Sequence, residues 1–111
     1  MTKDLSVSVL MDFYGELLTQ KQIEALNGYY NQDLSLAEIA EEMDISRQGV
    51  RDFIKKGELH LIEFEEKLGL AEKFLSIRKT ADDMSEIIAK MPQNGSTARL
   101  LGSLDEIVKQ L

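Results

Sequence analysis

The sequence predicts an all-α fold in which a helix-turn-helix is followed by a C-terminal helical extension. Apolar residues recur at a spacing near 3.6 along the chain, which is typical of amphipathic helices. No stretch alternates apolar and polar residues for long enough to indicate a strand. A chain of 111 residues can bury one modest core, so a single all-helical domain is expected over residues 1–111. We expect the helix-turn-helix in residues 17–56 and the helical extension in residues 57–111.

Two helices are expected before the central motif. The first covers residues 4–18. Its expected buried residues are Leu10, Phe13 and Leu17. The second covers residues 20–31, because Thr19 followed three positions later by Gln22 has the pattern of a capping box. Its expected buried residues are Ile23, Leu26 and Tyr30.

Residues 36–56 have the pattern of a helix-turn-helix. Ser35 and Glu38 form a second capping-box pattern, which indicates a helix beginning at residue 36. Ala40 is small where the second helix of the motif passes closely. Asp44 opens the turn at a position that commonly needs a positive φ, which Asp tolerates better than most residues. The apolar positions of the shared core are Ile39, Met43, Ile45, Val50 and Phe53.

The second helix of the motif carries the predicted nucleic-acid contacts. The N-terminal part of such a helix meets base edges in the major groove. Arginine bonds guanine bidentately and glutamine bonds adenine in the same way, so Arg47, Arg51 and Gln48 are candidate base contacts. Lys55 and Lys56 lie a turn further along and are expected to contact phosphates, whereas Ser46 caps the helix. The alternative interpretation of the basic row is an ordinary solvated helix face. The predicted nucleic-acid-binding residues are Ser46, Arg47, Gln48, Arg51, Lys55 and Lys56.

The charge distribution supports this assignment although the net charge, −7, disfavours nucleic acid. Residues 1–44 carry two basic and nine acidic side chains. Residues 45–60 carry four basic and two acidic side chains, and residues 61–111 carry seven basic and nine acidic ones. The one basic stretch therefore coincides with the motif, and the acidic remainder would confine phosphate contact to that surface.

The same residues resemble a known family. The segments that carry the resemblance are Leu18–Leu26, Tyr29–Tyr30, Leu34–Ala40 and Ile45–Arg51. They look like region 4 of bacterial sigma factors over about residues 17–56, and the whole chain resembles the YlxM family of bacterial DNA-binding proteins. The resemblance implies a sigma-region-4-like helix-turn-helix and a regulatory link to the signal recognition particle pathway, which for that family rests on gene neighbourhood.

This sequence also departs from the sigma-factor pattern. No basic cluster follows Lys56, and Glu63, Glu65 and Glu66 occupy positions where further phosphate contacts would be expected. The chain has no counterpart of sigma region 2, so we do not expect a complete sigma factor.

Apolar seams continue beyond the motif. The first seam has spacings of four and three residues and predicts that the recognition helix runs to residue 68, with Gly69 as its stop. This seam consists of Val50, Ile54, Gly57, Leu61, Phe64 and Leu68. A second seam predicts another long helix and consists of Phe74, Ile77, Ala81, Met84, Ile88 and Met91. The single proline, Pro92, and Asn94–Gly95 break the chain before a last helix, residues 97–110. The apolar residues of the last helix are Ala98, Leu101, Leu104 and Val108.

The seams leave the oligomeric state open. They can pack within one molecule, or they can form a homodimer, as DNA-binding helix-turn-helix proteins often do across two half-sites. We favour the homodimer.

The sequence does not predict an enzyme, a metal site or a cofactor. His60 is the only histidine and lies within a helical pattern, where a general base is a poor interpretation. Neighbouring carboxylates such as Asp82–Asp83 and Glu65–Glu66 point to different parts of a helix surface and are expected to be solvated. There is no cysteine, no membrane-spanning run and no signal-peptide pattern, so a cytoplasmic protein with no membrane partner is expected.

Two functions therefore remain. The first is a duplex-DNA-binding transcriptional regulator that uses the basic row. The second is an adaptor in the signal recognition particle pathway, with a protein or the particle's RNA as partner and the motif as a scaffold. We favour the first, because the basic residues collect where base contact needs them.

Overall fold

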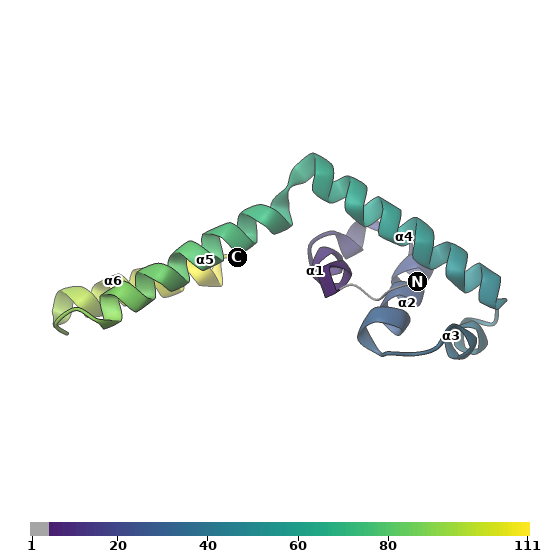
Figure 1. Ribbon diagram of the computed structural model, residues 1–111, viewed down its shortest axis with the longest axis horizontal. Helices are drawn as coiled ribbons and strands as arrows, with labels where there is room; N and C mark the ends of the chain where they lie inside the picture. Colours follow the sequence, from purple (N-terminus) through teal and green to yellow (C-terminus); the bar gives the residue numbers. More distant parts are fainter. Residues whose placement is uncertain (1–4) are drawn as a thin grey trace. The chain divides into compact units, whose positions relative to one another are not determined.

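The computed structural model describes residues 5–111, and this part of the chain is helical with no strand (Figure 1). It contains six α-helices, a 3₁₀ segment (η1) and a π-helical turn (η2). Their bounds are α1 Leu5–Tyr14, η1 Gly15–Leu17, α2 Gln20–Leu26, η2 Asn27–Asn31, α3 Leu36–Met43, α4 Arg47–Leu68, α5 Leu70–Ala89 and α6 Gly95–Lys109. The predicted all-α fold is confirmed. Asp4, the expected start of the first helix, lies outside the described residues.

The chain divides into two compact units, Met1–Ala71 and Glu72–Leu111. The expected boundary between a helix-turn-helix region and an extension, after residue 56, falls inside α4, which runs on without a break to Leu68. The single-domain prediction and that boundary both stay predictions.

Helix α4 forms the centre of the first unit, and α1, α2 and α3 all pack against it. Its predicted seam supplies the buried residues Val50, Ile54, Gly57 and Leu61, whereas Leu68 at its end is exposed. The other large side chains that are almost fully buried come from the three packed helices and are Tyr14, Leu26 and Ile39. Burial of side chains this large supplies most of the stability of such a helical unit.

Gly57 lets α2 approach α4 closely. A Cβ atom built on Gly57 would lie 2.6 Å from Cδ1 and 3.3 Å from Cγ of Leu26, which is itself fully buried. Gly28 serves η2 in a similar way, because a Cβ there would lie 3.1 Å from Cγ1 of Ile39. Two of the glycines therefore decide how near the helices of this unit can lie.

The expected buried face of the first helix is partly wrong. Leu17 is 60% exposed, whereas Tyr14 and Leu18 are buried and Leu10 and Phe13 are partly buried. The α-helix ends at Tyr14 and continues as η1, whose tighter turn of three residues rotates the following side chains relative to α-helical spacing. As a result Leu18, rather than Leu17, completes the core.

The second helix begins as predicted but does not stay α-helical. Thr19 and Gln22 form both hydrogen bonds of the capping box, which confirms that start. From Asn27 onward the chain forms the π-helical turn η2 instead of continuing α2. The turn that follows contains Asp33 with a φ of 53°, in the left-handed region that Asp tolerates better than most residues.

Hydrogen bonds of the Tyr14 and Glu65 side chains connect the C-terminal part of α4 with the first residues of α5. Gly69 separates these helices and has a φ of 61°, which confirms the predicted stop. The Tyr14 hydroxyl donates to Glu65 Oε1 at 2.6 Å and accepts from the backbone N–H of Leu70 at 3.0 Å. Glu65 Oε1 also accepts from the N–H of Ala71 at 3.0 Å. The expectation that Glu65 is a solvated charge is therefore wrong, because it serves the first backbone donors of α5.

Burial raises the pKa of the Tyr14 hydroxyl, and the neighbouring Glu65 carboxylate raises it further. Both effects disfavour a phenolate, since a buried anion beside another anion is poorly solvated and repelled. Tyr14 is therefore neutral when it makes these hydrogen bonds to Glu65 and Leu70.

Within the second unit, α5 and α6 lie along each other as a helical hairpin. The buried cluster between them consists of Ala81, Ile88 and Leu104, with Leu101 and Val108 partly buried beside it. Asn94 begins α6 with a capping box to Thr97, so this helix starts two residues earlier than predicted and buries Thr97 rather than Ala98. Three members of the second predicted seam, Ile77, Met84 and Met91, are exposed.

Candidate nucleic-acid interface

The turn between α3 and α4 has the geometry of the predicted motif. Asp44 ends α3 in the left-handed region, with φ 54° and ψ 48°, as predicted. The N–H of Ile45 donates to the carbonyl of Ala40 at 3.0 Å, which closes the turn against α3. Ala40 is buried, as expected where the two helices approach. The predicted core residues Ile39 and Val50 are also buried, and Met43, Ile45 and Phe53 pack against them.

Side-chain caps set the first residues of both helices of the motif. Ser35 Oγ accepts from the N–H of Glu38 at 3.1 Å, and the Glu38 carboxylate accepts from the N–H of Ser35 at 3.2 Å, which confirms the second capping box. Ser46 Oγ accepts from the N–H of Gly49 at 3.0 Å. Because the Ser46 cap determines where α4 begins, it also determines which side chains lie on the first turn of this helix.

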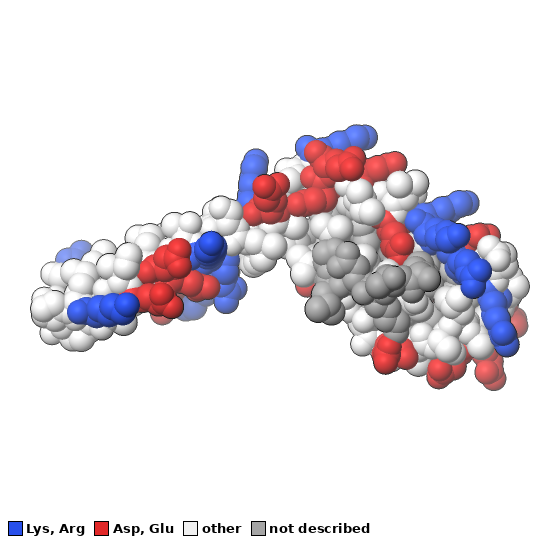
Figure 2. All heavy atoms as spheres, viewed as in Figure 1, with Lys and Arg blue, Asp and Glu red and all other residues white. Residues whose placement is uncertain are grey.

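The basic residues of α4 form one exposed row over its N-terminal half. Arg47, Arg51, Lys55 and Lys56 are all exposed, and Figure 2 shows the blue row that they form over this part of α4. Arg47, Arg51 and Lys55 follow one another at intervals of four residues, so they lie along one strip of the helix. Lys56 is turned about 100° from Lys55 and lies beside this strip. The acidic residues Glu41 and Glu42 are exposed on α3.

Gln48 is engaged within its own helix. Its Nε2 donates to Oδ1 of Asp52 at 3.0 Å, one turn further along. The side-chain amide is therefore oriented by Asp52, and a base contact by Gln48 requires this bond to be exchanged or shared. Asp52 also places a carboxylate among the basic side chains, and the sequence did not predict a role for it.

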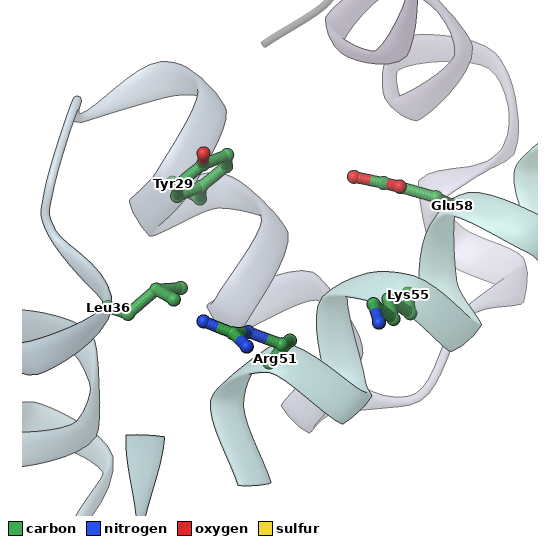
Figure 3. A pocket seen from close by; sticks show the side chains of 5 residues that line it. All are labelled: Tyr29, Leu36, Arg51, Lys55 and Glu58. Carbon is green, nitrogen blue, oxygen red and sulfur yellow. The ribbon is translucent and has the colours of Figure 1, made fainter. Parts of the chain in front are cut away.

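Arg51 and Lys55 line a surface hollow of about 460 Å³ (Figure 3). The other residues around it are Tyr29 on η2, Leu36 at the start of α3 and Glu58 on α4. In Figure 3 the Arg51 side chain extends from α4 toward Leu36, so its guanidinium lies near the start of α3. Of the predicted site residues, the hollow brings together Arg51 and Lys55 only.

Three neighbours of the basic row were not predicted from the sequence, namely Tyr29, Leu36 and Glu58. Glu58 follows Lys55 by three residues and Arg51 by seven, so helical spacing alone could have placed it on the same face. It accepts a hydrogen bond from the Tyr30 hydroxyl, which ties η2 to α4. Tyr29 packs edge-on against Tyr30, with ring centroids 5.1 Å apart. No sequence signal indicated that η2 would meet α4 at this point.

The described residues provide neither a candidate metal site nor a helix that could span a membrane. Within residues 5–111, no group of three or more histidine, aspartate or glutamate side chains is arranged to hold a metal ion. None of the described helices combines the length and apolar character needed to cross a membrane.

A comparison with known families identifies the chain. A family model described as "Putative helix-turn-helix protein, YlxM / p13 like" matches residues 1–99. The chain belongs to this family, UPF0122. The resemblance to the YlxM family found in the sequence is therefore confirmed. This is a family of helix-turn-helix type, not an enzyme family.

Relatives in the UPF0122 family match most of their length. A UPF0122 protein of Acetivibrio thermocellus is 41% identical over 100% of this chain and 97% of its own length. One from Halalkalibacterium halodurans is 43% identical over 96% of this chain and 98% of its own. One from Clostridium kluyveri is 47% identical over 79% of each chain.

Proposed function

We propose that this UPF0122 protein binds duplex DNA through the N-terminal half of α4 and acts as a cytoplasmic transcriptional regulator. The observation that carries the proposal is the exposed basic row on the second helix of a helix-turn-helix, on a chain whose net charge is −7. Phosphates are attracted to this row and repelled by the acidic residues elsewhere. The row therefore supplies both the attraction and the orientation that a DNA complex needs.

The residues of the row take different roles in this proposal. Arg47 and Gln48, in the first turn of α4, contact base edges in the major groove. Arg51 and Lys55 line the hollow beside the start of α3, where a phosphate would meet both cations. Lys56 contacts a phosphate outside the hollow. Ser46 contributes through its cap, and its hydroxyl hydrogen is a further donor. The sequence predicted that Arg51 contacts a base. Its position in the hollow means that it can contact either a phosphate or a base.

The test is fluorescence anisotropy of labelled duplex DNA at several salt concentrations. The Arg51→Ala variant is expected to bind roughly 10- to 100-fold more weakly than the wild type, the range for a good arginine contact. Arg78→Ala is the matched control, because Arg78 is also an exposed helical arginine and its loss changes the net charge equally. The proposal fails if no duplex binds at low salt, or if Arg78→Ala weakens binding as much as Arg51→Ala.

The acidic character of the chain favours a second candidate, an adaptor in the signal recognition particle pathway. In that case the acidic surface contacts a protein, or the basic row contacts the particle's RNA, and the motif is a scaffold. The same anisotropy series with signal recognition particle RNA separates the two nucleic acids. A pull-down partner that survives loss of Arg47 and Arg51 would favour the protein adaptor.

A further inference from the structure

The hairpin of the second unit exposes apolar side chains along one of its two flanks. A groove of about 270 Å³ runs between α5 and α6 on this flank. The residues that line it are Ser76, Ile77, Thr80, Ala81, Met84, Leu104 and Ile107. None of them is charged, and three of them, Ile77, Met84 and Ile107, are large apolar residues that are close to half exposed.

Two further residues extend this surface, which we call the apolar flank. Ile87 lies seven residues after Thr80, and Leu100 lies seven residues before Ile107, so helical geometry places each on the same strip of its helix as a lining residue. Both are exposed. The apolar flank therefore consists of Ile77, Met84, Ile87, Leu100 and Ile107.

The opposite flank of the hairpin is charged. Relative to the buried residues Ala81, Ile88 and Leu104, helical spacing turns its residues to the other side of both helices. These exposed residues are Arg78, Asp82 and Glu86 on α5 with Asp105 and Lys109 on α6. Charges also lie near the apolar flank, since Arg99 lines a hollow together with Leu100 and Lys73 lies one turn before Ile77, but none of them lines the groove.

We propose that the apolar flank is covered by the same flank of a second copy of this chain, giving a four-helix bundle related by a two-fold axis. A two-fold interface needs a surface complementary to itself, and an uncharged apolar strip meets its own copy without unpaired charge. A partner with a charged surface would leave its charges facing this strip. The seven-residue spacings of Ile77 with Met84 and of Leu100 with Ile107 match the shallow packing of helices in such bundles.

The small core of the hairpin is a further argument that a second copy of the chain covers the apolar flank. Residues 72–111 bury Ala81, Ile88 and Leu104 between two helices, although chain segments of about 40 residues usually need an oligomer or another constraint to be stable. The half-exposed side chains of the apolar flank offer on the order of a few hundred Å², the size at which apolar patches mark interaction surfaces. A second copy would convert this patch into a shared core. The inference is independent of DNA binding, because none of the proposed nucleic-acid contacts lies in the hairpin.

The first test is the mass of the full chain in solution, measured by light scattering after size exclusion over a range of micromolar concentrations. The wild type is expected at twice the chain mass of 12.6 kDa. The double variant Ile87→Glu/Ile107→Glu is expected to be monomeric, because it would bury carboxylates against the apolar flank. Leu75→Glu is the matched control on α5: Leu75 is 53% exposed and Ile87 63%, but Leu75 lies toward the charged flank. It should stay dimeric.

Cross-linking tests the position of the interface independently. The chain has no cysteine, so each single variant carries one thiol. Met84→Cys or Ile87→Cys is expected to be linked to its copy by a bifunctional thiol reagent, which does not require the two thiols to lie on the two-fold axis, and Leu75→Cys is not. The proposal is overturned by a wild type that stays at 12.6 kDa throughout, or by a dimer that persists in the double glutamate variant. Equal cross-linking of Leu75→Cys also overturns it. Far-UV circular dichroism checks that each variant keeps its helices.

Discussion

The two units of this chain use the same helical pattern and reach different degrees of burial. In the first unit, three helices pack around α4, and Leu26, Val50, Ile54 and Leu61 are fully buried. In the hairpin, α5 and α6 bury only a small cluster between them, and large residues that belong to the same kind of seam, such as Met84, stay exposed. An apolar seam therefore predicts a helix reliably, whereas its burial depends on how many neighbours surround it.

Small residues account for part of this difference. Gly57 lies where the Leu26 side chain approaches α4 closely, and the small residue Ala40 is buried. By contrast, a Cβ atom at Gly102 of α6 would meet nothing within 4 Å. Glycine in the first unit permits close packing, whereas Gly102 adds flexibility to an exposed helical position without a packing role.

The largest expected difference between the units is in their cores. Ile54→Ala is expected to lower the free energy of unfolding by about 3–4 kcal/mol, because the surrounding helices prevent the cavity from collapsing. Leu104→Ala should cost about 2 kcal/mol, since the hairpin can close around the smaller side chain. Urea unfolding followed by circular dichroism measures both values. A loss for Leu104→Ala as large as that for Ile54→Ala would contradict the comparison.

Glycine substitutions should change stability in opposite directions. Gly57→Ala is expected to destabilise the protein by about 1–3 kcal/mol, because the new methyl group overlaps the buried Leu26 side chain. Gly102→Ala should stabilise it by roughly 0.5–1 kcal/mol, because alanine favours the helix and the space is open. Both variants are compared by urea unfolding with the wild type. Stabilisation by Gly57→Ala would show that there is room between α2 and α4 for the added methyl group.

The caps of the two units should be similar in strength. Ser46→Ala removes the acceptor for the N–H of Gly49, and Asn94→Ala removes the acceptor for the N–H groups of Ser96 and Thr97. Each substitution is expected to cost about 1 kcal/mol. Thermal unfolding measures the loss, with Ser46→Thr and Asn94→Ser as controls that keep a capping oxygen. If Ser46→Thr and Asn94→Ser lose as much stability as the alanine variants, loss of the capping oxygen does not explain the destabilisation.

The smallest effect concerns Tyr14 and is visible only in alkali. Its pKa is raised above the ordinary 10.0, so above that pH unfolded Tyr14 loses its proton while the folded form keeps it. Ionisation therefore favours the unfolded state, and the contribution of Tyr14 to stability is lost as pH rises through and beyond 10.0. The stability advantage of the wild type over Tyr14→Phe should shrink over that range.

Urea unfolding of the wild type and Tyr14→Phe at neutral pH and at several alkaline pH values measures this change. The two proteins differ only at position 14, so the difference between their stabilities isolates Tyr14. A constant difference across the alkaline range would contradict the prediction.

Much of the fold could be predicted because its signals are local. The capping boxes at Thr19 and Ser35, the positive φ of Asp44 and the stop at Gly69 all depend on residues within a few positions of one another. The candidate site was predictable in the same way as far as the basic row of α4, although its binding role stays a proposal. The hollow beside that row was not predictable, since Tyr29 and Arg51 line it together only because the folded chain brings η2 near α4.

The helices, their caps, the turn of the motif and the helical row of basic residues could be predicted from local sequence, because hydrogen bonds and periodicity within a helix act over a few residues. The packing of the folded chain was needed to show that Leu18 replaces Leu17 in the core, that Glu65 bonds both Tyr14 and the start of α5, and that Ile77 and Met84 stay exposed. These outcomes depend on contacts between distant segments. Burial is a property of the neighbours that a side chain meets, and periodicity does not specify which neighbours these will be.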